Sequence, residues 1–145
     1  MPPNPDPPTT SVLFIDSSKK QRTYWAEQLK GVSPNYLIVE AKDRETALTL
    51  FRSRGFDCVV LELALGDQQG FQLLVDLVPN PRRPQVAVVV LTHMTQTGIW
   101  ELARLNGAHG CLVKDYITGK DLDQAIQRAV AFVGQMPKED RHRPH

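Results

Sequence analysis

The sequence predicts an α/β domain built on a doubly wound, five-stranded parallel sheet with helices on both faces. Five short and almost continuously apolar segments recur along the 145 residues. Strands of this kind are buried on both faces, which is typical of parallel sheets. Segments with helical spacing alternate with these strands, and that alternation is the signature of a parallel sheet covered by helices.

Each expected strand is a run of branched or otherwise apolar residues bounded by polar or turn-forming residues. In chain order these runs are SVLFID (11–16), YLIVEA (36–41), FDCVVLEL (56–63), QVAVVVLT (85–92) and GCLVK (110–114). Polar residues interrupt these runs mainly near their ends, so the strand centres are expected to be buried.

The expected helices separate these strands and carry start and stop signals of their own. They span residues 18–31, 44–55, 71–78, 96–107 and 119–133. Gly31 and Gly55 end the first two helices, and Asp43 is placed to cap the second. A proline-rich loop at 79–84 closes the third helix, whereas Gly98 weakens the fourth.

Right-handed crossovers leave few ways to wind five such units into one sheet, and the flavodoxin-like strand order 2-1-3-4-5 is the usual solution. Residues 1–10 hold five prolines and no core residue, so they are expected to form a disordered leader. Residues 134–145 are a polar tail without an output domain. The domain therefore occupies residues 11–133, and it is either a stand-alone module or a segment of a longer regulator or sensor.

Composition excludes several classes of protein. The 17 basic and 16 acidic residues give a net charge of +1, which argues against a general nucleic-acid surface. No apolar run is long enough to span a membrane, and the N-terminus has no signal-peptide pattern, so a cytoplasmic protein is expected. Cys58 and Cys111 lie inside apolar runs, two strand positions apart, and are expected to be free and packed. The four histidines show no metal-ligand spacing.

Polar side chains gather where the strands end. Asp16 follows the first strand, Glu62 lies near the end of the third, Thr92 ends the fourth and Lys114 ends the fifth. Ligand sites in such folds lie beyond the carboxyl ends of the strands, so these four residues are expected to converge. No glycine-rich phosphate-binding loop is present.

Four blocks in order resemble the receiver domain of bacterial two-component response regulators over residues 11 to about 133. These blocks are VLFIDSS, FDCVVLELALGDQQG, VVVLTH and NGAHGCLVKD. The resemblance implies that Glu62 occupies the phospho-acceptor position and that Asp16 and Ser17 occupy the position of the acid pair. It also implies that Thr92 is the family's hydroxyl residue and Lys114 its lysine.

Several residues depart from the family pattern. Glu62 replaces the acceptor aspartate, Ser17 replaces a metal-binding carboxylate, and His93 replaces a small residue; Gly66, Gln69 and Asp115 also differ from the commonest family residues. Mg²⁺ prefers carboxylate ligands, so binding through Asp16 is expected to be weak or absent. A carboxylate displaced by one methylene costs phosphoryl transfer about 10²-fold in rate. The sequence therefore predicts a pseudo-receiver that has no catalytic residue, needs no cofactor and is not an enzyme.

Two interpretations of Glu62 follow. Its longer side chain places negative oxygen about where phosphoryl oxygens would lie, within reach of Lys114 and Thr92, which would bias the domain toward an activated arrangement. Alternatively, Glu62 and Lys114 form a residual structural ion pair that favours no conformation. The sequence leaves both open.

The resemblance also indicates a partner surface on the fourth helix, the fifth strand and the fifth helix. Trp100 and Arg104 are one turn apart on the fourth helix, away from an apolar stripe of Ile99, Leu102 and Ala103, and Cys111 stands at the family's aromatic switch position. Tryptophan and arginine are enriched at binding hot spots. The expected partners are a histidine kinase, an output domain or a second copy of the chain, with no nucleic acid and no membrane bound by this domain.

Two alternative functions use the same residues. The chain could be a working phospho-receiver that uses a nonstandard acid, Asp67 or Glu62. It could also bind a small ligand or flavin, although the first loop, DSSKKQ, lacks the cradle that a flavin phosphate needs.

Overall fold

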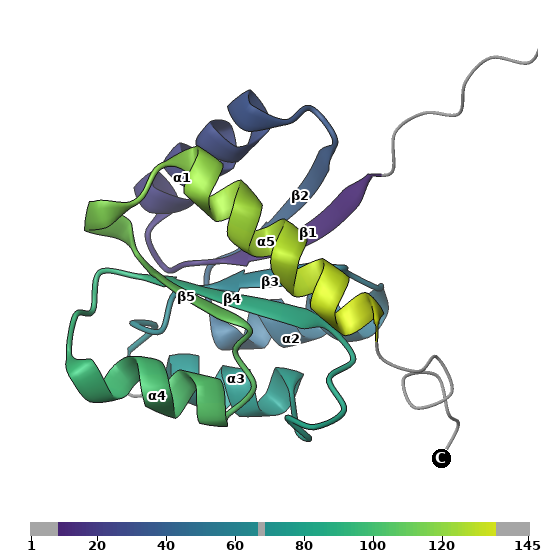
Figure 1. Cartoon of the computed structure of the whole chain (residues 1–145), viewed down its shortest axis with the longest axis vertical. Coiled ribbons are helices and arrows are strands. Elements are labelled where there is room, and N and C mark those ends of the chain that lie inside the picture. Colours follow the sequence, from purple (N-terminus) through teal and green to yellow (C-terminus); the bar gives the residue numbers. More distant parts are fainter. Residues whose placement is uncertain (1–8, 67–68, 136–145) are drawn as a thin grey trace, which may run out of the picture.

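The computed structural model describes residues 9–66 and 69–135 (Figure 1). Strands and helices alternate throughout, as the sequence predicts. The elements are β1 (Thr10–Ile15), α1 (Lys19–Val32), β2 (Tyr36–Ala41), α2 (Arg44–Ser53), β3 (Cys58–Leu61), α3 (Gln69–Leu77), β4 (Ala87–Thr92), α4 (Thr97–Leu105), β5 (Gly110–Val113), the 3₁₀ turn η1 (Lys114–Tyr116) and α5 (Gly119–Gly134).

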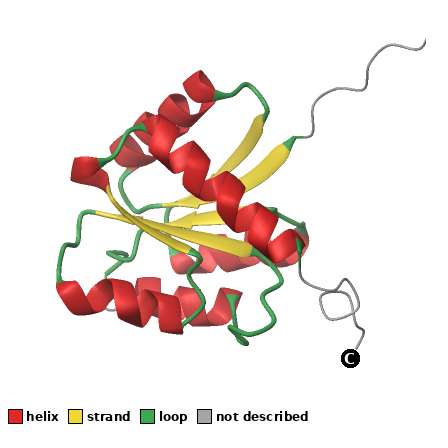
Figure 2. Ribbon diagram, in the orientation of Figure 1, coloured by secondary structure: helices red, strands yellow, loops and turns green. Residues whose placement is uncertain are grey.

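The five strands form one parallel sheet in the order β2-β1-β3-β4-β5, which confirms the predicted fold class. Helices α1 and α5 cover one face, and α2, α3 and α4 cover the other (Figures 1 and 2). Because all strands run in the same direction, their carboxyl ends meet at one edge of the sheet.

Alternate residues of each central strand point to opposite faces of the sheet, so the domain has two apolar cores. Ile15 of β1 and Leu61 of β3 pack in the core beneath α2, α3 and α4, whereas Phe14 and Val60 pack in the core beneath α1 and α5. Each of these four side chains is almost completely buried. This two-sided burial explains why the strands are apolar almost without interruption.

Side-chain caps fix where three helices begin. Ser18 caps α1 by accepting the Gln21 N–H. Asp43 caps α2 by accepting the Thr46 N–H, as the sequence predicts. Thr118 and Asp121 form a reciprocal capping box at the start of α5. Such caps satisfy backbone donors that have no partner within the helix.

Several element boundaries differ from the sequence prediction. Strand β1 begins at Thr10, inside the predicted leader, because Thr10 N–H bonds to the Asn35 carbonyl and extends the pairing with β2. Strand β3 has only four residues, so Glu62 lies just beyond it. Residues 1–8 of the predicted leader and residues 136–145 of the predicted tail lie outside the described residues.

The two cysteines are free, as predicted. Cys58 lies in β3 and Cys111 in β5, with β4 between them. Burial raises the pKa of the Cys58 thiol above its ordinary value, so the side chain is a packed, protonated thiol at neutral pH.

His109 joins β4 to the chain that enters β5. Its backbone N–H donates to the Val88 carbonyl at 2.7 Å, and its Nδ1 accepts the Val88 N–H at 3.0 Å. Burial lowers the pKa of His109 below its ordinary value of 6.5. A partly buried, neutral imidazole therefore completes the backbone hydrogen bonding of β4.

This arrangement predicts a pH-dependent stability. Since the folded His109 binds fewer protons than the unfolded residue, its contribution is complete above about pH 6.5 and is lost as the pH falls through the lowered pKa. We expect His109→Asn, which keeps a hydrogen-bond acceptor, to show a smaller loss of unfolding free energy between about pH 7 and pH 5. Urea unfolding at several pH values measures how the free energy of unfolding of the wild-type chain and of His109→Asn depends on pH. The same pH dependence in both proteins would contradict the role given to His109.

Candidate functional site

Four polar residues lie at the carboxyl edge of the sheet. Asp16 and Glu62 directly follow β1 and β3, Thr92 is the last residue of β4, and Lys114 directly follows β5. All four are buried. The structure therefore brings together the strand-end residues that the sequence singles out.

Lys114 bridges the two acids. Its Nζ donates to Asp16 Oδ2 at 2.6 Å and to Glu62 Oε1 at 3.2 Å. The side chains of Lys114, Asp16 and Glu62 are only 2%, 3% and 6% exposed. The shorter of the two contacts is to Asp16, a pairing that sequence reasoning did not identify.

The remaining carboxylate oxygens accept backbone hydrogen bonds. Asp16 Oδ1 accepts the Ser18 N–H at 2.9 Å, and Glu62 Oε2 accepts the Ala64 N–H at 3.2 Å. Two carboxylates and one ammonium leave a formal charge of −1, and these N–H groups help to compensate it. Each carboxylate is therefore held by one charged donor and one neutral donor.

Local backbone geometry positions the Glu62 loop. Gly66 has a φ of +83°, a conformation that other residues adopt only at a cost. A Cβ added to Gly70 at the start of α3 would lie 2.1 Å from the Leu63 carbonyl oxygen. The two glycines thus permit the turn and the close approach of α3 behind Glu62.

Arg22 anchors the loop after β1, and sequence reasoning missed it. Its guanidinium donates to the Asp16 carbonyl at 2.6 Å and pairs with Glu40 at 3.1 Å. The sequence feature that could have identified Arg22 is its position one helical turn after Ser18, from which an arginine can reach back to the end of the preceding strand.

Among the described residues, the side chains of Ser17 and Thr92 form no hydrogen bond with either acid. Ser17 is exposed, and Thr92 Oγ1 accepts the Met94 N–H at 3.1 Å. Within residues 9–66 and 69–135, no hydrogen bond joins Thr92 to Glu62. Of the two contacts expected of Glu62, the structure therefore shows the one to Lys114 and not the one to Thr92.

His93 pairs with Asp115 above the site, across the loops that follow β4 and β5. The distance from His93 Nδ1 to Asp115 Oδ1 is 3.2 Å, and both side chains are about half exposed. A hollow of about 250 Å³ lies nearby, lined by Lys20, Gln21, Tyr24, Trp25, His93, Lys114 and Ile117. Trp25 itself is buried in the core beneath α1 and α5.

The predicted partner residues do not all line one hollow. Trp100 and Cys111 line a hollow of about 350 Å³ with Tyr116, whereas Arg104 lies in another hollow, beside Ala108. Burial raises the pKa of the Cys111 thiol to about 11, against the opposing effect of the Arg104 guanidinium. Cys111 is therefore a protonated thiol at neutral pH.

The predicted apolar stripe of α4 is wrong at one position. Ala103 is buried and Ile99 is partly buried, but Leu102 is 47% exposed. Leu102 lies roughly 100° around the helix axis from Ala103, so the contact stripe of this short helix misses it.

Within the part of the chain that the structure describes, no group of three histidine, cysteine, aspartate or glutamate residues is arranged to hold a metal ion. No helix among these residues has both the length and the apolarity needed to cross a membrane.

Comparisons with known proteins agree with this architecture. The sequence model of the response regulator receiver domain family matches residues 12–127. No curated protein matches the chain at a significant level of sequence similarity.

Solved receiver domains share the fold at low sequence identity. A CheY-like receiver domain protein from Methanospirillum hungatei superposes with a TM-score of 0.76 at 16% identity, covering 89% of this chain and 99% of that one. The receiver domain of the putative regulator NarL from Mycobacterium tuberculosis has a TM-score of 0.75 at 22% identity, covering 86% and 98%. A receiver domain protein from Clostridium thermocellum has a TM-score of 0.76 at 22% identity, covering 88% and 99%.

Proposed function

Since the chain belongs to the response regulator receiver domains of two-component signalling, we propose that it is a pseudo-receiver that acts through protein–protein contacts without being phosphorylated. In this proposal the domain binds a histidine kinase, an output domain or a second copy of itself. It is not an enzyme, because it does not catalyse transfer of a phosphoryl group to its own acceptor position. Its cytoplasmic location is a prediction from the sequence.

The observation that carries this proposal is the bridge from Lys114 to Asp16 and Glu62. Every carboxylate oxygen of the two acids already accepts a hydrogen bond. These hydrogen bonds fix the orientation of both carboxylates, and phosphoryl transfer depends on how the attacking oxygen is positioned toward the phosphorus. Glu62 is instead held as the partner of a buried lysine.

The donor set also disfavours Mg²⁺, the ion that the family implies. Ser17 offers a neutral hydroxyl where a second strand-end carboxylate would neutralise the metal's charge, and Asp16 and Glu62 both bond to Lys114. A divalent ion would therefore have to displace a buried ammonium group. We propose that these residues bind Mg²⁺ weakly or not at all.

The Glu62 contacts favour the structural interpretation of this residue over the phosphate mimic. A phosphate mimic would engage the hydroxyl of Thr92 as well as Lys114, but among the described residues Glu62 accepts hydrogen bonds from Lys114 and the Ala64 N–H and none from Thr92. In this proposal the buried charges hold the strand ends in one arrangement, and signalling relies on which partner is present.

The test is phosphorylation by a small donor. After incubation of the wild-type chain with Mg²⁺ and acetyl phosphate, we expect intact-mass spectrometry to show no added phosphoryl group. A receiver domain with an aspartate acceptor, treated in parallel, provides the positive control. Addition of one phosphoryl group to the wild-type chain would overturn the proposal in favour of a working phospho-receiver with a nonstandard acid.

A further inference from the structure

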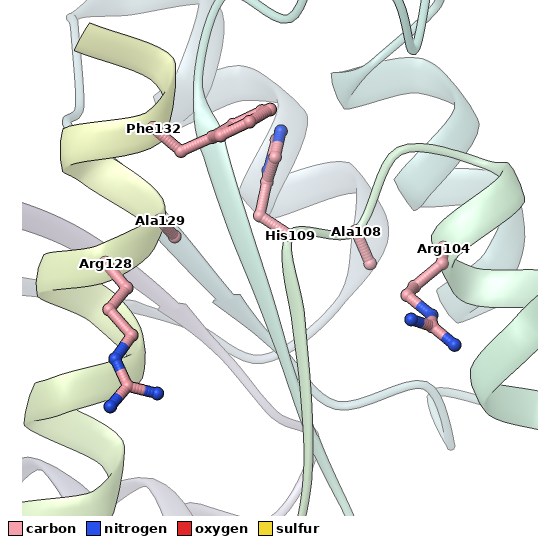
Figure 3. A pocket seen from close by; sticks show the side chains of 6 residues that line it. All are labelled: Arg104, Ala108, His109, Arg128, Ala129 and Phe132. Carbon is pink, nitrogen blue, oxygen red and sulfur yellow. The ribbon is translucent and has the colours of Figure 1, made fainter. Parts of the chain in front are cut away.

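A groove of about 430 Å³ lies where the end of α4, the start of β5 and the C-terminal half of α5 meet (Figure 3). We call it the α4–α5 groove. Its lining residues are Arg104, Ala108, His109, Arg128, Ala129 and Phe132. Sequence reasoning identified only Arg104 among them.

Two arginines flank this groove from different helices. Figure 3 shows Arg104 extending from α4 and Arg128 from α5 on opposite sides of the strand that begins near His109. Both arginines are exposed, and neither forms an ion pair with any residue in 9–66 or 69–135. Two arginines without carboxylate partners among the described residues therefore line the same groove from opposite sides.

His109 supplies a third donor. Because its Nδ1 accepts the Val88 N–H, the neutral ring carries its proton on Nε2. Nε2 has no hydrogen-bond partner among the described residues, and the ring packs against Phe132 with centroids 5.8 Å apart. The groove thus presents donors and no side-chain acceptor.

Apolar side chains also border the groove: Ala108 and Ala129 are buried, and two larger side chains are exposed. Ala108 and Ala129 lie between the arginines, while Phe132 is 57% exposed and Leu105 at the end of α4 is 75% exposed. A second hollow, lined by Glu101, Arg104 and Leu105, continues the surface along α4. This surface is larger than a small anion needs, and an aromatic ring beside arginines is typical of a protein interface.

From the charge and the apolar surface together, we infer that the α4–α5 groove binds an acidic segment of a partner protein, in which carboxylates flank an apolar side chain. The carboxylates pair with Arg104 and Arg128, and the apolar side chain packs on Ala108, Ala129 and Phe132. This inference rests on the proposed function, since it names the chemistry of the partner. The groove shares no lining residue with the Asp16, Glu62 and Lys114 cluster.

The test uses fluorescence anisotropy with the full chain and a labelled, amphipathic peptide of glutamate and leucine, compared with the same peptide carrying glutamine for glutamate. We expect the affinity of the glutamate peptide to be at least about tenfold higher than that of its glutamine counterpart. Arg104→Glu and Arg128→Glu should each weaken binding about tenfold, as charge reversal at a binding hot spot does. Arg52→Glu, at an exposed position of α2, is the matched control and should leave binding unchanged.

Backbone amide chemical shifts of the ¹⁵N-labelled chain locate the peptide. Chemical-shift changes on addition of the peptide that are confined to residues 103–110 and 128–133 would support the inference. Equal binding of both peptides, or an equal effect of Arg52→Glu, would overturn it. Displacement of the peptide by equimolar succinate would overturn the inference and indicate a small-anion site. A homodimer that Arg104→Glu breaks would overturn it too and indicate an interface between two copies of the chain.

The two proposals fail in different experiments. Phosphoryl uptake by the wild-type chain would overturn the pseudo-receiver, even if the acidic peptide still bound through Arg104 and Arg128. Conversely, a chain that takes up no phosphoryl group and does not bind the peptide would overturn only the inference about the groove.

Discussion

Lys114→Met is expected to lower the free energy of unfolding by about 3–5 kcal/mol, the cost of removing one partner from a buried ion pair. The substitution leaves Asp16 and Glu62 facing each other without a counter-ion, and both are almost fully buried. Two neutral N–H donors remain to compensate two charges. Urea unfolding measures the loss, and Lys120→Met, at an exposed position of α5, is the matched control.

A double-mutant cycle isolates the contact between Glu62 and Lys114. Glu62→Gln alone should cost less than Lys114→Met, because Lys114 keeps its shorter bond to Asp16. The double variant Glu62→Gln/Lys114→Met should recover part of the loss, since only one buried carboxylate then lacks a cation. Losses that simply add would mean that the two residues do not interact energetically, and the proposed function would lose its main support.

The triple variant Ser17→Asp/Glu62→Asp/His93→Ala is expected to take up one phosphoryl group from acetyl phosphate in the presence of Mg²⁺. It restores a second carboxylate, shortens the acceptor by one methylene and removes the bulky ring that pairs with Asp115. Glu62→Asp alone corrects the position of the acceptor, but it leaves Ser17 without a metal-binding carboxylate and keeps His93, so this single variant should not be labelled.

Controls separate metal binding from transfer in this variant. Ser17→Asp/Glu62→Asn/His93→Ala keeps the restored carboxylate but has no acceptor, so it should bind Mg²⁺ and gain no mass. The fluorescence of Trp25, which lies near Lys114, reports metal binding. Robust labelling of Glu62→Asp alone would show that Ser17 and His93 matter less than proposed.

Much of the fold follows directly from the amino-acid pattern. Five apolar runs that are buried on both faces require a parallel sheet, and right-handed crossovers restrict its strand order. The structure has that order, and the strand ends carry Asp16, Glu62, Thr92 and Lys114 to one edge. Periodicity and connection rules are local or topological, so a single sequence can reveal them.

Only the tertiary packing determined which residues far apart in the sequence come within bonding distance. The sequence paired Lys114 with Glu62, but the ammonium also bonds to Asp16, and at a shorter distance. The Thr92 hydroxyl accepts the Met94 N–H from the loop after β4, and no hydrogen bond joins it to Glu62 among the described residues. A pattern places these side chains at one edge, but the choice among partners within a few ångströms depends on loop geometry.

The α4–α5 groove shows the same limit on a larger scale. Arg104, His109 and Arg128 lie on three elements, and no spacing along the chain relates them. Helical periodicity also assigned Leu102 to the core, but the short contact between α4 and the sheet leaves it exposed. The sequence by itself determined which residues are apolar, capped or charged, whereas the tertiary structure decided which of them meet, because contact depends on how the helices pack across the sheet.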